Sequence, residues 1–324
     1  MRAPLLCLFL LALAASPQRA AAQEKVWRVG LLSNSPPSSG VSTSWRDGVL
    51  RSLARNGFGL GRNLELVERY SEGRHDRLPH LAREISAEGV DAVVAISDVS
   101  VRAVLAATQA TPIVMVVGDD PVAAGFVAGF ARPGGRVTGI FYQTAEGDAK
   151  RLQLLREAIP GARRFGYLGL SYQAVARADV MTRAAAQLGV ELTMHWIGGP
   201  AKYATAFTAM KNENVSGVVV SAAQPLATDA PRVAASAAEH GLPTICEWDY
   251  MARAGCVFGY GHDLAFAQRR VGEYVARILK GAVPAELPVE RSDAWKLTVN
   301  LGAAARLGLE IPPSLLARAD EVIE

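Results

Sequence analysis

The chain offers few residues spaced for catalysis or metal binding. The three glycines of Gly57–Gly61 lack the G-x-G-x-x-G spacing of a dinucleotide loop, and they precede an apolar strand instead of following one. The segment Gly169–Gln173 begins like a nucleophile elbow but has no second glycine. His75 and His80 are five positions apart, a spacing that does not place both rings on one helix face as a zinc site requires. We therefore expect a protein that is not an enzyme, with no catalytic residue, metal site or cofactor.

Polar, acidic and aromatic residues instead recur directly after short apolar runs. The residues in question are Ser33, Asn34, Ser97, Asp98, Asp119 and Tyr142 in the first half of the chain, and Ser171, Tyr172, Ser221, Gln224, Glu247, Trp248 and Tyr260 in the second. If the runs are strands of an open parallel sheet, a ligand binds beyond their carboxyl ends, where these residues lie. Acids suit an ammonium group, hydroxyls and helix N–H groups suit a carboxylate, and rings suit apolar parts. The set predicts a site for a small polar or amine-bearing solute.

The same residues also fit structural roles, which the sequence alone leaves open. Serine and aspartate are favoured helix N-caps, and aromatic residues pack well at junctions between domains. The caps would be Ser97, Asp98 and Asp119, and the packing residues Tyr142, Trp248 and Tyr260. We expect several of the candidates to line one cleft.

Short strands alternating with amphipathic helices must position these residues. The first half predicts strands at Val26–Leu32, Leu64–Val67, Val90–Ile96, Pro112–Val117 and Val137–Phe141, with a helix at Pro121–Phe130 before the last. Strands that are apolar on both faces, separated by helices, are typical of a parallel sheet covered on both sides. The pattern then starts again at a helix over Ala149–Ile159 and runs to a strand at Cys256–Tyr260. The sequence therefore predicts two doubly wound α/β units in tandem.

A C-terminal segment follows the second unit. It contains a predicted helix at Leu264–Leu279, a stretch with Pro284 and Pro288, a strand at Lys296–Asn300 and helices through the C-terminus. We expect this segment to cross back and pack on one or both units.

Composition narrows the class of protein. The 324 residues are 50% hydrophobic and 20% charged, which excludes a disordered chain, a collagen-like fibre and a small disulfide scaffold. Lys and Arg number 34 against 31 Asp and Glu, and a net charge of +3 is too small to indicate a nucleic-acid partner.

The N-terminus predicts export. Arg2 precedes the apolar run Leu5–Ala15, and the small residues Ala20–Ala22 offer a cleavage site, so we interpret residues 1–22 as a cleaved signal peptide. The run is shorter than the roughly 20 residues of a membrane-spanning helix. Cys7 opens the run instead of following it, so we predict a periplasmic protein that is not a lipoprotein. In an oxidising compartment Cys246 and Cys256 fit either a disulfide or two small buried side chains.

Motifs that point to one known family lie in Tyr70–Arg74, Asp76–Pro79, Val90–Val94, Ala106–Val114, Gly118–Gly125, Ala131–Gly139 and Asn300–Glu324. These segments resemble the substrate-binding proteins of ABC transporters, in particular those related to tryptophan- and tyrosine-uptake proteins. This sequence departs from the family's pattern at Ser97-Asp98, where a pair of small residues is usual, and at Gly169–Ser171, where Asn-Pro is common. Both departures leave the identity of the ligand open.

The resemblance implies a type I periplasmic-binding-protein fold, with two lobes joined by a three-crossing hinge. We expect crossings near Phe141–Ala145, Gly259–Asp263 and Val289–Ala294, a first lobe of residues 23–141 with about 263–288, and a second of 142–262 with about 289–324. The implied protein is a monomer that captures an amino acid or related metabolite by hinge closure and delivers it to a permease with a separate cytoplasmic ATPase. The alternatives are a subunit that loads a periplasmic sensor or receptor, and a secreted α/β enzyme.

Overall fold

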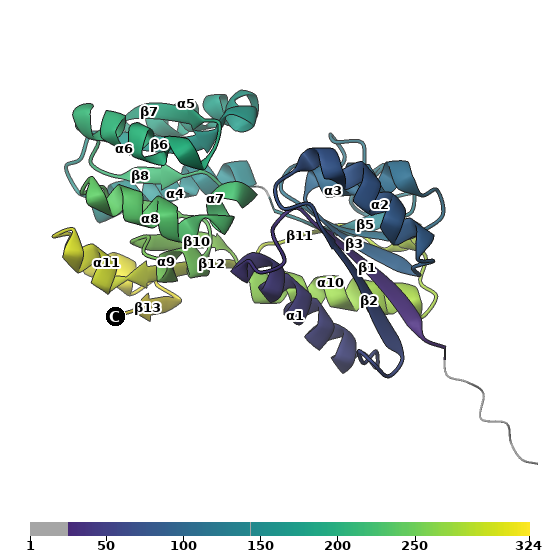
Figure 1. Cartoon of the computed structure of the whole chain (residues 1–324). Coiled ribbons are helices and arrows are strands. Elements are labelled where there is room, and N and C mark those ends of the chain that lie inside the picture. The colour runs from purple at the N-terminus through teal and green to yellow at the C-terminus, as the bar shows by residue number, and fades with distance from the viewer. Residues whose placement is uncertain (1–24, 143) are drawn as a thin grey trace, which may run out of the picture.

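The computed structural model describes residues 25–142 and 144–324, and the predicted signal peptide lies outside them. The chain forms two α/β lobes that lie side by side (Figure 1). None of the described helices combines the length and apolar character needed to cross a membrane.

The first lobe is built on a parallel sheet in the order β11-β5-β4-β3-β1-β2. Its strands are β1 (Trp27–Ser33), β2 (Leu64–Tyr70), β3 (Ala92–Ile96), β4 (Ile113–Val117), β5 (Val137–Phe141) and β11 (Glu290–Arg291). Every residue of the central strands β3 and β4 is buried, as their unbroken apolar sequences require when helices cover both faces.

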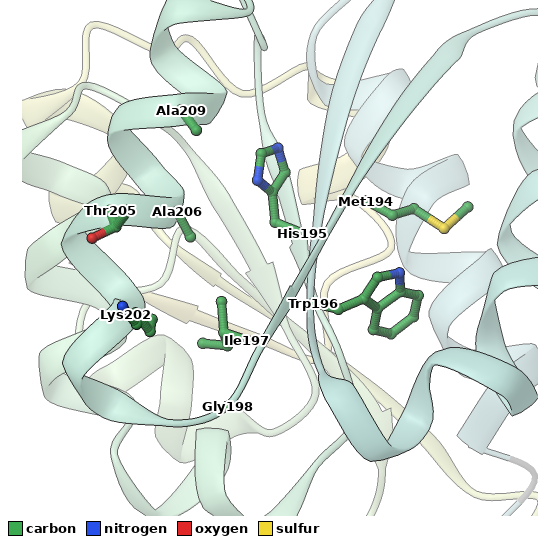
Figure 2. Close-up of a pocket in the computed structure, with 9 residues that line it drawn as sticks. All are labelled: Met194, His195, Trp196, Ile197, Gly198, Lys202, Thr205, Ala206 and Ala209. Carbon is green, nitrogen blue, oxygen red and sulfur yellow. The ribbon is translucent and has the colours of Figure 1, made fainter.

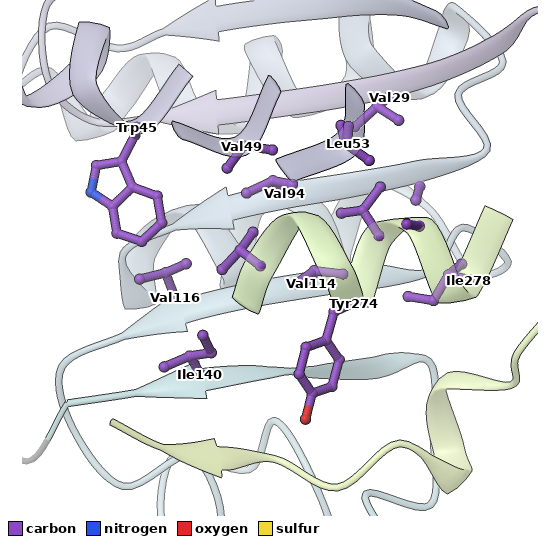
Figure 3. Close-up of a cluster of buried hydrophobic side chains, with 14 of the residues drawn as sticks. Val29, Trp45, Val49, Leu53, Val94, Val114, Val116, Ile140, Tyr274 and Ile278 are labelled. Carbon is purple, nitrogen blue, oxygen red and sulfur yellow. The ribbon is translucent and has the colours of Figure 1, made fainter. Parts of the chain in front are cut away.

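The helices of the first lobe divide between the two faces of its sheet. One face is covered by α1 (Gly40–Arg55) and α10 (Leu264–Leu279), the other by α2 (Leu78–Ala87) and α3 (Asp98–Ala107). Trp45, Val49 and Leu53 recur at helical spacing on α1 and pack with α10 over the sheet (Figure 3). The two helices approach closely because a Cβ at Gly272 would lie 2.4 Å from the Cβ of Ser52. The C-terminal segment therefore completes the core of the N-terminal lobe.

The second lobe is built on a sheet in the order β13-β12-β10-β9-β8-β6-β7, parallel except where β12 runs against β10. Its strands are β6 (Arg164–Leu170), β7 (Glu191–Ile197), β8 (Val218–Val220), β9 (Thr244–Cys246), β10 (Phe258–His262), β12 (Trp295–Asn300) and β13 (Glu321–Ile323). One face carries α4 (Thr144–Ala158), α5 (Ala174–Leu188), α11 (Leu301–Arg306) and α12 (Pro313–Leu316). The other carries α6 (Tyr203–Asn212), α7 (Gln224–Thr228), α8 (Ala230–Glu239) and α9 (Asp249–Arg253). The prediction of two doubly wound lobes is confirmed.

In the described residues the chain passes between the lobes three times, after β5, after β10 and after β11. The last passage follows β11, which pairs with β5 and so extends the first sheet to Arg291. Rings from these passages pack against one another. The ring centroids of Tyr142 and His262 are 4.8 Å apart and stacked, and those of His262 and Trp295 are 3.9 Å apart and tilted.

Two predicted elements are wrong. Residues 121–126 form turns instead of the expected helix, because Gly125 takes a left-handed φ of 74° and Asp120 caps the N–H groups of Val122 and Ala123 locally. The C-terminus does not end in helices either. It ends in β13, which extends the second sheet beside β12.

Cys246 and Cys256 form a disulfide, with their Cα atoms 6.3 Å apart. Both residues are fully buried, and Cys246 is the last residue of β9. The bond therefore fixes the end of the strand that leads into Glu247.

Candidate functional site

A cavity of about 540 Å³ lies where the two lobes meet. On the first lobe its walls follow the carboxyl ends of β1, β3, β4 and β5, and on the second lobe they follow those of β6, β8 and β9. Parallel strands deliver the residues after them to one edge of a sheet, so two facing sheets place two such sets opposite each other. The topology alone therefore accounts for the location of the cavity.

Nine of the thirteen candidate residues line this cavity. They are Asn34, Ser97, Asp98, Asp119, Tyr142, Tyr172, Gln224, Glu247 and Trp248. The other four lie elsewhere. Ser33 is buried and its hydroxyl oxygen accepts a hydrogen bond from the N–H of Ser35. Ser171 is exposed and is the first residue of a 3₁₀ turn. Ser221 donates to the buried Gln173, and Tyr260 stacks on Trp295 at 5.1 Å.

Sequence reasoning missed other residues that line the cavity, among them Trp45, His75, Thr144, Arg177 and Tyr250. Most of them lie on or next to helices, so a search of strand ends could not find them. The clearest signal was Arg177, a basic residue on the same buried face of α5 as Met181 and Ala184. An arginine on an apolar helix face needs a charged partner.

Aromatic side chains form much of the apolar wall. Tyr142 meets Trp248 edge to face, with ring centroids 5.8 Å apart. Trp248 and Tyr250 pack against the hydrophobic cores of both lobes, so they lie at the junction itself. Trp45 faces the same space from α1. Such a wall suits a ligand with an apolar or aromatic part.

A buried ionic network centred on Asp148 lies behind the cavity. Asp148 is fully buried and accepts hydrogen bonds from Arg151, from the hydroxyl of Tyr167 at 2.8 Å and from the N–H of Ala222 at 3.2 Å. Arg151 also donates to the backbone oxygen of Tyr260 at 2.6 Å. The network joins α4 to the middle of β10 and to the segment that follows β8.

Arg177 extends this network to the first lobe. Its Nε lies 3.7 Å from Asp148 Oδ2, while its Nη2 lies 3.3 Å from Asp119 Oδ1 and donates to the hydroxyl of Thr144. Asp119 follows β4 of the first lobe, so the guanidinium links the two lobes.

A second link is made by hydroxyl and amide groups. Gln224 Nε2 donates to Ser35 Oγ at 2.7 Å, and the same Oγ lies 3.2 Å from the Thr228 hydroxyl. Ser35 belongs to the first lobe, whereas Gln224 and Thr228 belong to α7 of the second. The lobes therefore contact each other at two places beside the cavity.

Two acids at the cavity carry perturbed pKa values. Burial raises the pKa of Glu247 to about 7, an effect that nearby Arg151 and Arg177 oppose and Asp148 reinforces. Burial and the charge of Asp119 raise the pKa of Asp98, whose carboxylate accepts a long hydrogen bond from the Gly118 N–H at 3.5 Å. Among the described residues none donates a hydrogen bond to the Glu247 side chain, which is only 5% exposed.

Three further polar atoms of the cavity residues lack a hydrogen-bond partner within the described part of the chain. They are the hydroxyls of Tyr142 and Tyr250 and the Oε1 atom of Gln224. Burial and the charge of Glu247 raise the pKa of both tyrosines well above the usual value. Buried polar groups in native proteins are nearly always satisfied. The described residues therefore do not fully satisfy the polar groups that surround the cavity.

Metal binding has no support in the geometry. His75 bonds Asn34, with 3.1 Å between Nε2 and Nδ2, and residues 25–142 and 144–324 hold no cluster of His, Cys, Asp and Glu arranged as metal ligands.

A second hollow, of about 420 Å³, lies at the outer edge of the second lobe between β7 and α6 (Figure 2). It is lined by Met194–Gly198 and by residues of α6, and His195 pairs with Glu213 at 3.1 Å. Figure 2 shows Trp196 projecting to the opposite side of β7 from Ile197. All of its lining comes from one lobe, so movement of the lobes does not reshape it. The cavity between the lobes is the stronger candidate.

Two parallel-sheet lobes that enclose a polar and aromatic cavity define a solute-binding protein of the type I periplasmic-binding-protein fold. Residues 39–323 match the family model described as "ABC transporter substrate binding protein", and the chain belongs to this family. The resemblance of the motifs to this family is thereby confirmed.

Relatives are distant in sequence and close in fold. A curated "Tyrosine-binding protein" of Clostridioides difficile (strain R20291) is 23% identical over 258 residues, 79% of this chain and 74% of the relative. A conserved domain protein from Vibrio cholerae is 25% identical, with a TM-score of 0.84 and coverage of 92% of this chain and 100% of that one. A protein from Streptococcus pneumonia, solved in complex with L-Trp, is 24% identical, with a TM-score of 0.83 over 92% of this chain and 100% of that one. Near this level of identity the likeness is one of fold.

Proposed function

We propose that this chain is the extracytoplasmic solute-binding component of an ABC importer. It captures a small polar solute, an amino acid or related metabolite, between its lobes and delivers it to a membrane permease that a separate ATPase drives. The cleaved signal peptide predicted at residues 1–22 would place it in the periplasm, where we expect it to act as a monomer. One observation carries this proposal. The cavity of about 540 Å³ takes its polar and aromatic lining from both lobes.

The size and chemistry of the cavity favour a compact ligand. Small-molecule sites commonly enclose roughly 300–1,000 Å³ with mostly apolar walls and a few polar groups. Here Trp45, Tyr142, Trp248 and Tyr250 supply apolar walls, and their neighbours supply acids and amides. The relatives named for tyrosine and solved with L-Trp support a ligand of amino-acid size.

In this proposal, ligand binding changes the shape of the protein by closing the hinge between its lobes. A ligand shifts the equilibrium between the open and closed forms by the difference between its binding free energies for the two forms. Opening would break the contacts of Asp119 with Arg177 and of Ser35 with Gln224, and it would expose the ring of Trp248. A ligand that touches both lobes adds further contacts of this kind.

A panel of amino acids and small amines tests the proposal by thermal shift and calorimetry. A true ligand at 100 times its Kd should stabilise the protein by roughly 2.7 kcal/mol. X-ray scattering should show a more compact particle in its presence. Trp248→Ala should weaken binding strongly, whereas Trp196→Ala, a change of the same residue type outside the cavity, should not.

Failure of every compound to shift the protein, or equal effects of the two tryptophan variants, would contradict the proposal. Measuring solute uptake in cells that lack this chain distinguishes an importer component, which delivers the solute to a permease, from a protein that loads a sensor. Loss of uptake is the result expected for the importer.

A further inference from the structure

The charges that face the cavity are unequal. Of its described lining residues Asp98, Asp119 and Glu247 are acids, and Arg177 is the only one with a permanent positive charge. A zwitterionic amino acid needs a partner for its carboxylate as well as one for its ammonium group. A partner for the carboxylate would have to come from Arg177 or from a helix N-terminus.

Arg177 already has partners. Its guanidinium lies 3.3 Å from Asp119 and 3.7 Å from Asp148, and it donates to Thr144. A ligand carboxylate beside Arg177 would compete with Asp119 and Asp148 for the charge of the guanidinium and would meet electrostatic repulsion from both acids. The positive charge of Arg177 is therefore already balanced by two carboxylates of the chain, so it attracts an anion only weakly.

The helix that could bind an anion is occupied by its own side chains. Residues at the N-terminus of α3 line the cavity, but Ser97 Oγ already accepts the N–H of Ser100. Asp98 lies in the first turn, and its carboxylate lines the cavity. A helix N-terminus favours one negative charge. A second carboxylate beside Asp98 would meet electrostatic repulsion.

Glu247 provides the opposite kind of site. It is only 5% exposed, it lines the cavity, and no described residue donates a hydrogen bond to its side chain. Burial and the charge of Glu247 raise the pKa of Tyr142 and Tyr250, whose hydroxyls are unpaired among the described residues, and Trp248 is the next residue in the chain. A buried carboxylate without a partner is unfavourable. A cationic nitrogen would pair with it and contact the aromatic faces around it.

We propose, on the basis of the solute-binding function above, that the cavity selects a net-cationic amine over the corresponding zwitterionic amino acid. The ammonium group lies against Glu247 among Tyr142, Trp248 and Tyr250. Asp98 disfavours a carboxylate at the other end of the ligand. The substrate class is an apolar or aromatic amine whose carboxylate is absent or masked as an amide or ester.

Ligands that share one side chain and differ in which charged groups they carry test this inference. One set is tyramine, tyrosine and 3-(4-hydroxyphenyl)propionate, and the other is isoamylamine, leucine and 4-methylpentanoate. Calorimetry near pH 8 should give each amine an affinity about tenfold or more above that of its amino acid, a factor typical of a single hydrogen bond to a charged group. The carboxylates should not bind.

Two variants assign the selectivity to its residues. Glu247→Gln should weaken amine binding by about tenfold to a hundredfold, as loss of a charged hydrogen-bond partner does. Asp98→Asn should raise the affinity for the amino acids and bring the two classes to within a few-fold, because the repulsion is removed. Asp179→Asn, which removes an exposed acid of α5 outside the cavity, should change neither value.

The outcomes separate this inference from the function on which it rests. Amino acids that bind as tightly as the amines, or a selectivity unchanged in Asp98→Asn, would overturn the inference and leave the solute-binding function standing. Binding only of compounds without an amine would do the same. A protein that binds no member of either set and nothing else in the panel would lose both.

Discussion

Two buried carboxylates of the second lobe, Asp148 and Glu247, have opposite surroundings. Asp148 is fully buried and accepts hydrogen bonds from Arg151, Tyr167 and the N–H of Ala222. Glu247 is 5% exposed and accepts none from the described residues, although Arg151 contributes to its electrostatic environment. The same chemical group therefore stabilises the fold in one place and remains unpaired beside the cavity in the other.

Their positions in the chain account for the difference. Asp148 lies one turn before Arg151 on α4, so the helix brings its counter-ion to it. Glu247 follows β9 at the carboxyl edge of the sheet, where the polypeptide turns toward the opposite lobe. Opposite stability effects of the two neutralising substitutions would be the clearest sign of this division.

The largest effect is expected at Asp148. Asp148→Asn keeps the shape of the side chain but leaves Arg151 buried without its counter-ion, which should cost about 3–5 kcal/mol of unfolding free energy. Chemical denaturation near neutral pH measures the change, with Asp179→Asn as the control for loss of an exposed acid. A loss below about 1 kcal/mol, the usual value of a surface ion pair, would show that the network is not structural.

The opposite sign is expected at Glu247. Its pKa of about 7 in the folded protein lies above the ordinary value of 4.5, so the folded state holds a proton that the unfolded chain has released between these pH values. Glu247 therefore lowers stability progressively as the pH rises from 4.5 to 7, and the full cost persists above 7.

Glu247→Gln removes that cost. The ligand-free variant should be more stable than the wild type by about 3 kcal/mol near pH 8, and the gain should vanish near pH 4.5, as the difference of the two pKa values requires. Urea denaturation at several pH values measures it. A variant less stable than the wild type near pH 8 would mean that the carboxylate is satisfied by the fold, and the contrast with Asp148 would be lost.

The sequence predicted the lobes and the edge of the sheets at which the cavity lies, because strand order and strand ends are local patterns. It could not separate Asp148 from Glu247. The partners of Asp148 include the N–H of Ala222, which is 74 positions away, and only the packed fold brings them together. Trp45 and Arg177 were missed for a related reason, since which face of a helix meets the other lobe depends on how the lobes are joined.

The incorrect helix at residues 121–130 has both a local and a tertiary cause. The apolar residues there have a helical period, but Gly125 adopts a left-handed φ of 74° and the chain turns after it. A glycine within an apolar pattern is compatible with either outcome, and the choice depends on the packing of the loop against α3. Arg102 of that helix lies 4.8 Å from the ring of Phe126.

The smallest effect is expected at the exposed end of the network that contains Asp148. Asp119 is 60% exposed and pairs with Arg177 across the lobes, so solvent screening should limit the pair to less than about 1 kcal/mol. Because this contact exists only when the lobes meet, Asp119→Asn should leave the unfolding free energy nearly unchanged and should weaken binding of tyramine by roughly two- to fivefold. Calorimetry at low and high salt measures the effect, which should shrink as salt screens the charges. A large loss of stability in Asp119→Asn would show that Asp119 stabilises the fold as Asp148 does. The cavity wall would then contain a structural acid, and the contrast between Asp148 and Glu247 would not separate structural acids from acids of the cavity.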